Sequence, residues 1–212
     1  MTTDHAPDSE GRTSRFVVAG DGTRLHALDW GGEGPPVLLI HGARRTGRSW
    51  NAVARRLRED FRVVALDSRA HGDSGDPAVG YRAVERAGDI AAVATGLDLP
   101  PHFVIGHSLG GGSGALYAAR NPDAVRAAVL VEPTPTGPDH WQRVGMFDDD
   151  WKPVRESQGR NGWSSIDELR GRLEKNRMTS TWTPEVLEDV LREKTILRED
   201  GSVSIKWSPS FY

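Results

Sequence analysis

The sequence predicts an α/β fold in which helices cover both faces of a mostly parallel sheet. Between residues 36 and 132, short apolar runs of strand length alternate with segments whose apolar residues have helical spacing. This alternation is typical of parallel strands that are buried on both faces by their connecting helices. The chain has 212 residues, of which 37% are hydrophobic and 27% charged, which is enough for a sizeable core and typical of a globular protein.

The predicted elements follow one another in a regular order. Residues 15–20 and 24–30 are expected to form a hairpin, because the Asp21-Gly22 pair between them is a typical two-residue turn. The later strands are predicted at 36–40, 62–67, 102–106 and 128–132, and the helices between them at 50–57, 82–97 and 114–120.

Composition changes near residues 133–140, a stretch rich in proline and turn formers. All 20 alanines lie at or before Ala128, whereas all four lysines lie at or after Lys152. We therefore expect a boundary there between two modules. The predicted parts are a flexible tail (1–14), a core (15–135) and a second region (136–212) that holds helices at 165–177 and 184–193 and a hairpin turning at Asp200-Gly201.

Charge and composition exclude several classes of partner. The net charge is −3 and the pI is about 6.2, so nothing favours binding to nucleic acid or to an anionic membrane surface. The chain has no apolar run of the roughly 20 residues that cross a bilayer, and its first residues lack a secretory signal. The absence of cysteine excludes disulfides, thiolate metal sites and a thiol nucleophile. We expect a cytoplasmic protein.

The strongest functional signal is a serine on a sharp turn. Gly106-His107-Ser108-Leu109-Gly110 follows an apolar strand directly and precedes a helix, which is the setting that gives the G-x-S-x-G pattern its meaning. Glycines two places before and after the serine remove side chains that would collide in so tight a turn. Ser108 is therefore predicted to be a nucleophile at the carboxyl end of the sheet. The alternative, that the glycines only allow close helix packing, is the weaker interpretation.

A second feature fits an acyl-transfer site. The strand 36–40 runs into His41-Gly42-Ala43, a loop that approaches the same edge of the sheet. Stabilising an oxyanion takes two N–H donors, one from the residue after the nucleophile and one from such an earlier loop. Leu109 and Ala43 are the residues so placed. His41 lies at the strand end, where a structural role fits better than that of a base.

Together these segments resemble a known family. HGARRTGRSW, DSRAHGDSG and GHSLGG, in this order, are similar to motifs of the α/β-hydrolase superfamily, in its cofactor-free esterase, perhydrolase and C–C hydrolase branches. The similarity covers about residues 15–135 and implies an α/β-hydrolase fold with no cofactor and no metal. Ala70 stands where the family usually has glycine. The serine at position 108 argues against epoxide hydrolases and haloalkane dehalogenases, whose nucleophile is aspartate.

The resemblance also implies a catalytic acid and a histidine. Glu132 ends the strand after the nucleophile helix, a place that the acid occupies in part of the family, although most members place it one strand later. The alternative is a carboxylate that only ends the strand. None of the seven histidines matches the family's position for the base, and His71 and His140 are the remaining weak candidates.

The usual arrangement of the family explains why no histidine base is found in this sequence. Its members insert a mostly helical cap after this strand, which would correspond to residues 136–212, and then return to the sheet for two more strand–helix units. At about 30 residues per unit, roughly 60 residues are absent. We therefore expect a truncated or fragment form that lacks the last units and the catalytic histidine.

Two functions from different classes remain open. The first is a serine hydrolase that acts on a small ester or related carbonyl substrate through an acyl-enzyme. The second is a non-catalytic binding protein of the same fold. A partner chain that supplies the missing strands, or a homo-oligomer, is a further possibility, because the sheet would otherwise expose a long parallel edge.

Overall fold

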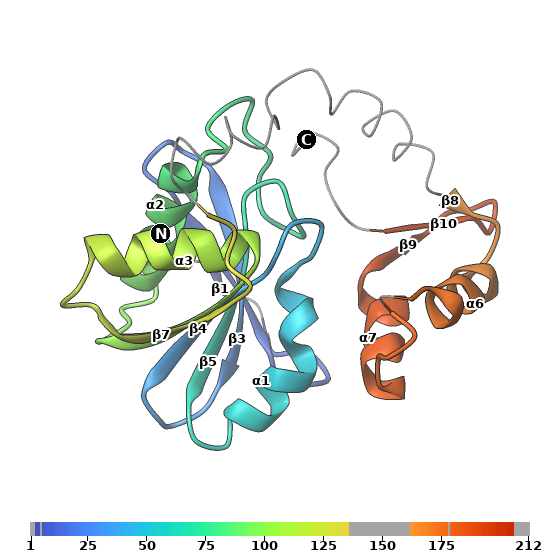
Figure 1. Ribbon diagram of the computed structural model, residues 1–212, viewed down its shortest axis with the longest axis horizontal. Helices are drawn as coiled ribbons and strands as arrows, with labels where there is room; N and C mark the ends of the chain where they lie inside the picture. The colour runs from blue at the N-terminus through green and yellow to red at the C-terminus, as the bar shows by residue number, and fades with distance from the viewer. Residues whose placement is uncertain (1–2, 5, 136–161, 178, 206–212) are drawn as a thin grey trace.

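A computed structural model of the chain describes residues 3–4, 6–135, 162–177 and 179–205 (Figure 1). Seven strands form one sheet in the order β1-β2-β3-β5-β4-β6-β7. Strands β5, β4, β6 and β7 run parallel, and β1, β2 and β3 are antiparallel to their neighbours. The strands are β1 (Thr3–Asp4), β2 (Thr13–Val18), β3 (Arg24–Gly31), β4 (Pro36–Ile40), β5 (Arg62–Asp67), β6 (His102–His107) and β7 (Val125–Val131).

The predicted hairpin is present between β2 and β3. The N–H of Ala19 donates to the Thr23 carbonyl at 2.8 Å, and Gly22 has a φ of +87°, a conformation that glycine adopts without steric cost. The two strands pair antiparallel from Thr13 opposite Asp29 to Val18 opposite Arg24. This pairing confirms the hairpin, but its turn is longer than the predicted two-residue turn at Asp21-Gly22, because the Gly22 N–H donates to the Ala19 carbonyl at 2.9 Å and centres the turn on Gly20 and Asp21.

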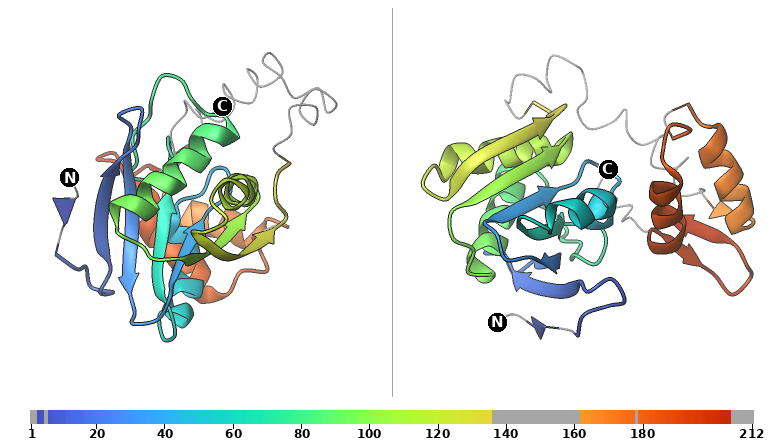
Figure 2. Two further views of the ribbon diagram at one scale, coloured as in Figure 1. Left: turned by 90° about the vertical axis from the view of Figure 1, so that its left-hand side faces the viewer. Right: turned by 90° about the horizontal axis from the view of Figure 1, so that it is seen from below.

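Helices cover both faces of the sheet, as the alternating sequence pattern predicted (Figure 2). On one face, Ile40 and Leu66 pack against Ile90 of α2 and Tyr117 of α3. On the other face, residues of β3, β4 and β5 pack against Ala54 of α1. The sheet is thus buried between two apolar clusters. The helices of this part are the 3-10 helix η1 (Gly47–Trp50), α1 (Asn51–Leu57), α2 (Ala83–Gly96) and α3 (Leu109–Arg120).

Residues 162–205 form a second lobe beside α1 (Figure 1). Its small core consists of Leu169, Leu191 and Val203, and the turn at Asp200-Gly201 joins β9 to β10 as predicted. Thr183 caps the second helix, where its hydroxyl accepts the Val186 N–H at 3.4 Å. The elements of this lobe are β8 (Gly162–Trp163), α6 (Ile166–Lys175), α7 (Pro184–Glu193), β9 (Thr195–Leu197) and β10 (Val203–Ile205).

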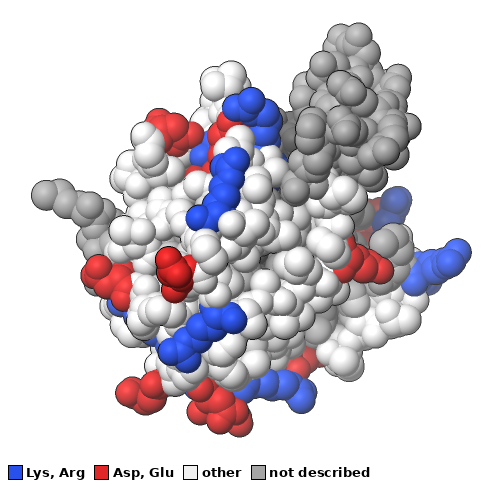
Figure 3. Space-filling model, turned by 60° about the vertical axis from the view of Figure 1, so that its left-hand side comes forward, with Lys and Arg blue, Asp and Glu red and all other residues white. Residues whose placement is uncertain are grey.

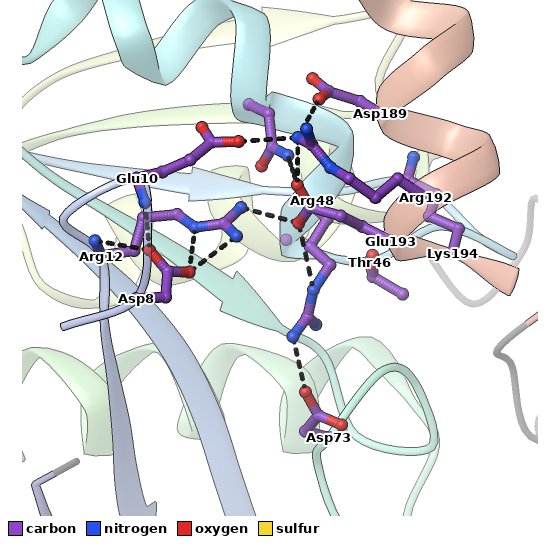
Figure 4. Close-up of polar contacts among 12 residues, drawn as sticks. Asp8, Glu10, Arg12, Thr46, Arg48, Asp73, Asp189, Arg192, Glu193 and Lys194 are labelled. Atoms are coloured by element: carbon purple, nitrogen blue, oxygen red, sulfur yellow. Dashed lines mark hydrogen bonds and ion pairs between the residues drawn. The ribbon is translucent and has the colours of Figure 1, made fainter. Parts of the chain in front are cut away.

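Charged side chains hold α7 against the core (Figure 4). The Glu193 carboxylate accepts hydrogen bonds from Arg12 at 2.7 Å and from Asn51 at 3.1 Å. Nearby, the Arg55 guanidinium binds both oxygens of Asp189 at 2.9 Å and also contacts Glu10. The segment predicted as a flexible tail (1–14) therefore contains a turn that takes part in this contact. The sequence did not predict that structure.

The predicted boundary at 133–140 lies mostly outside the described residues, so the domain limits stay a prediction. No helix within residues 6–135, 162–177 or 179–205 is long and apolar enough to cross a lipid bilayer.

Candidate active site

Ser108 occupies a strained turn between a strand and a helix. Strand β6 ends at His107 and α3 begins at Leu109, which leaves Ser108 alone between them. Its backbone has φ +51° and ψ −116°, a region that residues other than glycine rarely adopt. Such a conformation costs about 1–3 kcal/mol and persists only where the surroundings enforce it. The strain is the one that the G-x-S-x-G turn predicts.

Hydrogen bonds to β7, to the residues that follow it and to α3 enforce this conformation. The Ser108 N–H donates to the Val131 carbonyl at 2.9 Å, and the Ser108 carbonyl accepts the Thr134 N–H at 2.9 Å. The same carbonyl accepts the Gly112 N–H of α3 at 3.0 Å. Both backbone groups of the serine are thus fixed from outside its own turn, and its side chain is presented at the carboxyl end of the sheet.

The turn packs directly against the loop that follows β4. A Cβ atom on Gly110 would collide with the backbone oxygens of Ile40 and His41. A Cβ atom on Gly42 would lie 2.7 Å from His107 Nδ1 and 3.2 Å from the Ser108 Cβ. Real Cβ atoms do not approach backbone oxygens so closely, so position 110 requires glycine, whereas a side chain at position 42 would force the His107 ring to move. The loop predicted to supply an oxyanion donor therefore touches the predicted nucleophile.

The two predicted oxyanion donors lie on either side of this contact. Ala43 follows Gly42 in the loop, and Leu109 is the first residue of α3. The N–H groups of a first helical turn have no acceptor within the helix and carry the positive end of its dipole. The structure thus brings Ala43 and Leu109 to the two segments that meet at Ser108. Their role as donors stays a prediction.

Two buried histidines hold the loop after β4 (residues 41–44) in place. His71 Nε2 accepts the Arg44 N–H at 3.2 Å, and His41 Nε2 accepts the Ser68 N–H at 3.0 Å. A ring nitrogen that accepts a hydrogen bond carries no proton, so each of these two rings has its proton on Nδ1. The Nδ1–H of His41 donates to the Gly42 carbonyl at 2.7 Å. Burial lowers the pKa of His41 to about 3 and also lowers that of His71. Both rings are therefore neutral at pH 7.

These contacts decide between the roles considered for the two histidines. His41 has the structural role that the sequence favoured. His71 uses Nδ1 on the Arg69 carbonyl at 2.9 Å and Nε2 on the oxyanion loop, so neither nitrogen is directed to Ser108. His71 is thus a support for the loop rather than the weak candidate base that the sequence allowed.

Asp67 joins the start of η1 to the loop that follows β5. Its buried carboxylate accepts the Gly47 N–H at 2.6 Å and the Asp73 N–H at 3.0 Å, and it contacts His26 Nδ1 at 2.7 Å. Burial alone would raise the pKa of Asp67, but the hydrogen bond and charge of His26 lower it below its usual range. In the sequence the segment 67–74 was only a polar loop. A carboxylate at the end of a buried strand is the signal that could have indicated this structural role.

The predicted acid, Glu132, is not the side chain after β7 that contacts Ser108. Glu132 follows β7 with a φ of +45° and an exposed side chain. The side chain that reaches the nucleophile is Thr134, whose Oγ1 lies 3.4 Å from Ser108 Oγ. No sequence pattern pointed to Thr134, because the contact depends on the path of the chain after the strand. The role of Glu132 as acid stays a prediction.

The general base is not identified among the described histidines. His26 contacts Asp67 and Ser14, and His102 lies between the Pro100 carbonyl and the Tyr117 hydroxyl. The ring of His107 is the side chain that lies against Gly42. His5 and His140 lie outside the described residues.

Two clusters have side chains close enough together to hold a cation, but both are combined with arginine. His26, Asp67 and Asp73 lie beside Arg48, which is 3.0 Å from Asp73. Glu10, Asp189 and Glu193 surround the guanidinium groups that bind α7 to the core (Figure 4). Guanidinium groups already balance these carboxylates, so both clusters fit ion-pair networks better than metal sites.

Comparison with known proteins identifies the family. A family model described as the alpha/beta hydrolase fold matches residues 35–155. The non-heme chloroperoxidase of Streptomyces lividans is 41% identical over 122 residues, which are 56% of this chain and 44% of that protein. The bifunctional esterase/perhydrolase of Acinetobacter calcoaceticus is 39% identical over 123 residues, which are 57% of this chain and 45% of that protein.

A solved structure extends the likeness to most of the chain. The crystal structure of E-2-(acetamidomethylene)succinate hydrolase superposes with a TM-score of 0.76 at 26% identity, covering 94% of this chain and 70% of that one. This chain spans less than half the length of the two curated relatives above. The family model covers more than half of the chain and includes residues 41–44 and Ser108, so this chain belongs to the α/β-hydrolase fold family.

Proposed function

We propose that Ser108 is the nucleophile of a serine hydrolase that cleaves a small ester or a related carbonyl compound. The observation that carries the proposal is the strained backbone of Ser108, held at the end of β6 in contact with the Gly42-Ala43 loop. Strain of this kind is retained where it serves a site. The relative named as an esterase/perhydrolase supports the choice of an ester substrate.

The proposed reaction proceeds through an acyl-enzyme. Ser108 Oγ attacks the carbonyl carbon while a histidine base takes its proton, and the Ala43 and Leu109 N–H groups hold the oxyanion. The intermediate expels the alcohol, which takes up the proton from the histidine. A water molecule, activated by the same base, then attacks the acyl carbon and releases the acid and free Ser108.

The base belongs outside the described residues. The five described histidines contact other groups, so the proposal assigns this role to a histidine of a longer form of the protein or of a partner chain. The chain alone should then acylate slowly and deacylate still more slowly. An acyl-serine would accumulate rather than turn over.

Imidazole can replace the absent base and so test the proposal. The chain is incubated with p-nitrophenyl acetate, with and without imidazole, and acetylated peptides are identified by mass spectrometry. We expect an acetyl group on Ser108 that forms faster with imidazole and is absent from Ser108→Ala. Acetylation spread over other residues, with none on Ser108, would refute the nucleophile. Steady-state turnover without imidazole that His140→Ala abolishes would place the base within this chain.

A second function has one observation in its favour. Among the described residues, the hydroxyl of Ser108 contacts Thr134 and no histidine, which also fits a binding protein that has kept the turn without the chemistry. The imidazole experiment separates the two functions, because a binding protein would remain unacetylated at Ser108 even when a base is supplied.

The proposal does not extend to the exact reaction, the location or the partners of the protein. Peracid formation, acyl transfer and C–C cleavage use the same nucleophile and oxyanion donors, so the geometry does not separate them from ester hydrolysis. Three expectations from the sequence remain predictions. They are a cytoplasmic location, a small-molecule substrate with no nucleic-acid or membrane partner, and activity without a cofactor or metal.

A further inference from the structure

Two cations without an acidic partner lie where the second lobe meets the core. Arg45 directly follows the loop after β4 (residues 41–44), and its guanidinium carbon lies 5.4 Å from the centre of the Trp182 ring. Burial lowers the pKa of Arg45, and no acidic group among the described residues offsets that effect. Lys194 follows α7 and is buried, with its Nζ 2.6 Å from Ser49 Oγ. In the part of the chain that the structure describes, neither member of this cation pair (Arg45 and Lys194) forms an ion pair with a carboxylate.

The carboxylates that act on the charge of Lys194 are already bound by other groups. They are Asp67, Asp189 and Glu193. Asp189 and Glu193 belong to the network that holds α7 (Figure 4), and Asp67 accepts N–H groups from η1 and from the loop after β5. Burial, with the positive charge of Arg45, lowers the pKa of Lys194 to about 7 despite these carboxylates. The cation pair therefore carries positive charge that the described residues leave unbalanced.

The cation pair lies beside the loop that touches the predicted nucleophile. A Cβ atom on Gly42 would lie 3.2 Å from the Ser108 Cβ, and Arg45 is three residues further along the chain. Three residues span at most about 11 Å, so the Arg45 backbone stays within that distance of Gly42. Burial lowers the pKa of His41 most, and the positive charge of Lys194 contributes to the same shift, which places the amine near the start of this loop. A small molecule at Ser108 can therefore extend to the cation pair.

We propose that the cation pair binds a carboxylate of the substrate, which makes the proposed enzyme a hydrolase of small carboxylate-bearing esters. The inference rests on the proposed function, because it places the reacting carbonyl of the same molecule at Ser108. A guanidinium can hold both oxygens of a carboxylate, and an ammonium adds a further charge-assisted hydrogen bond. A protonated lysine has three donors, of which Ser49 occupies one, so Lys194 has donors left for the anion. The bound carboxylate also offsets the cost of holding two like charges away from solvent.

Ordinary surface cations would bind such an anion less well. On the face shown in Figure 3, the Lys and Arg side chains are scattered, and acidic side chains lie among them. Charges on such a surface are screened by salt, and each binds a single counter-ion only weakly. Lys194 is only 6% exposed, so its charge is screened much less. An anion should therefore prefer the cation pair.

Adipate binding tests the anion site without any chemistry at Ser108. Isothermal titration calorimetry at constant ionic strength measures the dissociation constants of adipate and of its neutral dimethyl ester. We expect the chain to bind adipate and not the ester, and Arg45→Gln and Lys194→Met each to weaken adipate binding about tenfold or more. Arg56→Gln is the matched control, because Arg56 is exposed on α1 and its replacement removes the same charge. Circular dichroism checks that each variant is folded. Binding that Arg56→Gln weakens as much as Arg45→Gln would overturn the proposal.

The affinity for adipate should also depend on pH in a definite direction. Below pH 7 Lys194 is already protonated, so the affinity should be constant. Above pH 7 adipate has to bind together with a proton, so the affinity should fall by up to about tenfold per pH unit. Lys194→Met should lack this fall, and a flat wild-type profile from pH 6 to 9 would remove the amine from the site. The charged or titratable groups around the amine are Arg45, His41, Asp67, Asp189 and Glu193.

Acylation tests whether the anion site serves Ser108. The chain is incubated in the presence of imidazole with mono-p-nitrophenyl adipate or with its methyl ester, which has the same chain without the charge. Transfer of the acyl group to Ser108 Oγ releases p-nitrophenol, and mass spectrometry locates the modified residue. We expect the charged ester to acylate Ser108 about tenfold faster than the neutral one. Arg45→Gln should abolish this preference, and Arg56→Gln should keep it.

The two sets of measurements separate this inference from the proposed hydrolase. Acylation of Ser108 at equal rates by the two esters would refute the carboxylate-bearing substrate and leave the nucleophile supported. Adipate binding that depends on Arg45, without acylation of Ser108 by either ester, would support the anion site and refute the hydrolase. Absence of adipate binding to the folded chain would refute the anion site itself.

Discussion

A single missing methyl group at Gly42 sets how closely the oxyanion loop approaches the nucleophile. We expect Gly42→Ala to slow imidazole-assisted acetylation of Ser108 about tenfold, because the new Cβ would displace His107 or Ser108. Overpacking of this kind should also lower the free energy of unfolding by about 1–3 kcal/mol. Peptide mass spectrometry and urea denaturation give the two quantities.

Gly88 provides the matched control for that substitution. It lies on the exposed side of α2 with no heavy atom within 4 Å of an added Cβ. Gly88→Ala should leave acetylation unchanged and raise the free energy of unfolding by roughly 0.5–1 kcal/mol through helix propensity. Equal acetylation rates in the two variants would remove the loop contact from the mechanism.

Lys194 is a buried amine that should make stability depend on pH. Burial, with the positive charge of Arg45, lowers the pKa of Lys194 from 10.5 to about 7, and its Nζ lies 2.6 Å from Ser49 Oγ. Between pH 7 and 10.5 the unfolded chain binds the extra proton, so the free energy of unfolding should rise with pH. The slope is at most about 1.4 kcal/mol per pH unit. Below pH 7 the cost of the buried charge is fully present.

Comparison with Lys194→Met isolates this contribution. The variant should lack the rise between pH 7 and 10.5 and should be the more stable protein at pH 6. Denaturation at a series of pH values measures both. Parallel profiles for the two proteins over this window would show that the amine stays charged in the folded chain.

At the scale of elements, α7 depends on charged contacts for its position on the core. Glu193 accepts hydrogen bonds from Arg12 and Asn51, and removal of its charge leaves the Arg12 guanidinium with its ion pair to Asp8. Glu193→Gln should therefore loosen the helix by about 1–3 kcal/mol, seen as faster amide exchange in α7 and not in α2.

An ion pair on the outer side of the same helix provides the control. Glu188 pairs with Arg170 in solvent, where such contacts contribute less than about 1 kcal/mol. Glu188→Gln should leave exchange in α7 nearly unchanged. Similar exchange in the two variants would mean that apolar packing, and not the charged network, positions the helix.

Two elements differ from their predicted limits. Helix α3 was predicted at 114–120 but begins at Leu109, and β7 was predicted at 128–132 but covers Val125–Val131. The glycines at 110–112 are typical of a loop because glycine has low helix propensity, yet close packing at Gly110 and Gly111 requires small residues in this first turn of α3. Tertiary contacts thus set limits that local propensity does not reveal.

At the scale of the whole molecule, local motifs were predictable and distant contacts were not. The strained turn at Ser108 depends on a few neighbouring residues, and the sequence motif predicts it. The close approach of Gly42 to Ser108 depends on the order of the strands, which the alternating sequence pattern predicts. The contact between Arg12 and Glu193 joins residues 181 positions apart, and the contact of Thr134 with Ser108 depends on the path after β7. Neither leaves a periodic or motif signal in the sequence.

Strand β7 supplies the carbonyl that accepts the Ser108 N–H, so the backbone of the proposed nucleophile is held by a strand other than its own. The pairing of β7 with β6 and the conformation of Ser108 are therefore coupled. By reciprocity, a reversible inhibitor that binds Ser108 only in this conformation would stabilise that pairing by the same factor by which the pairing favours binding.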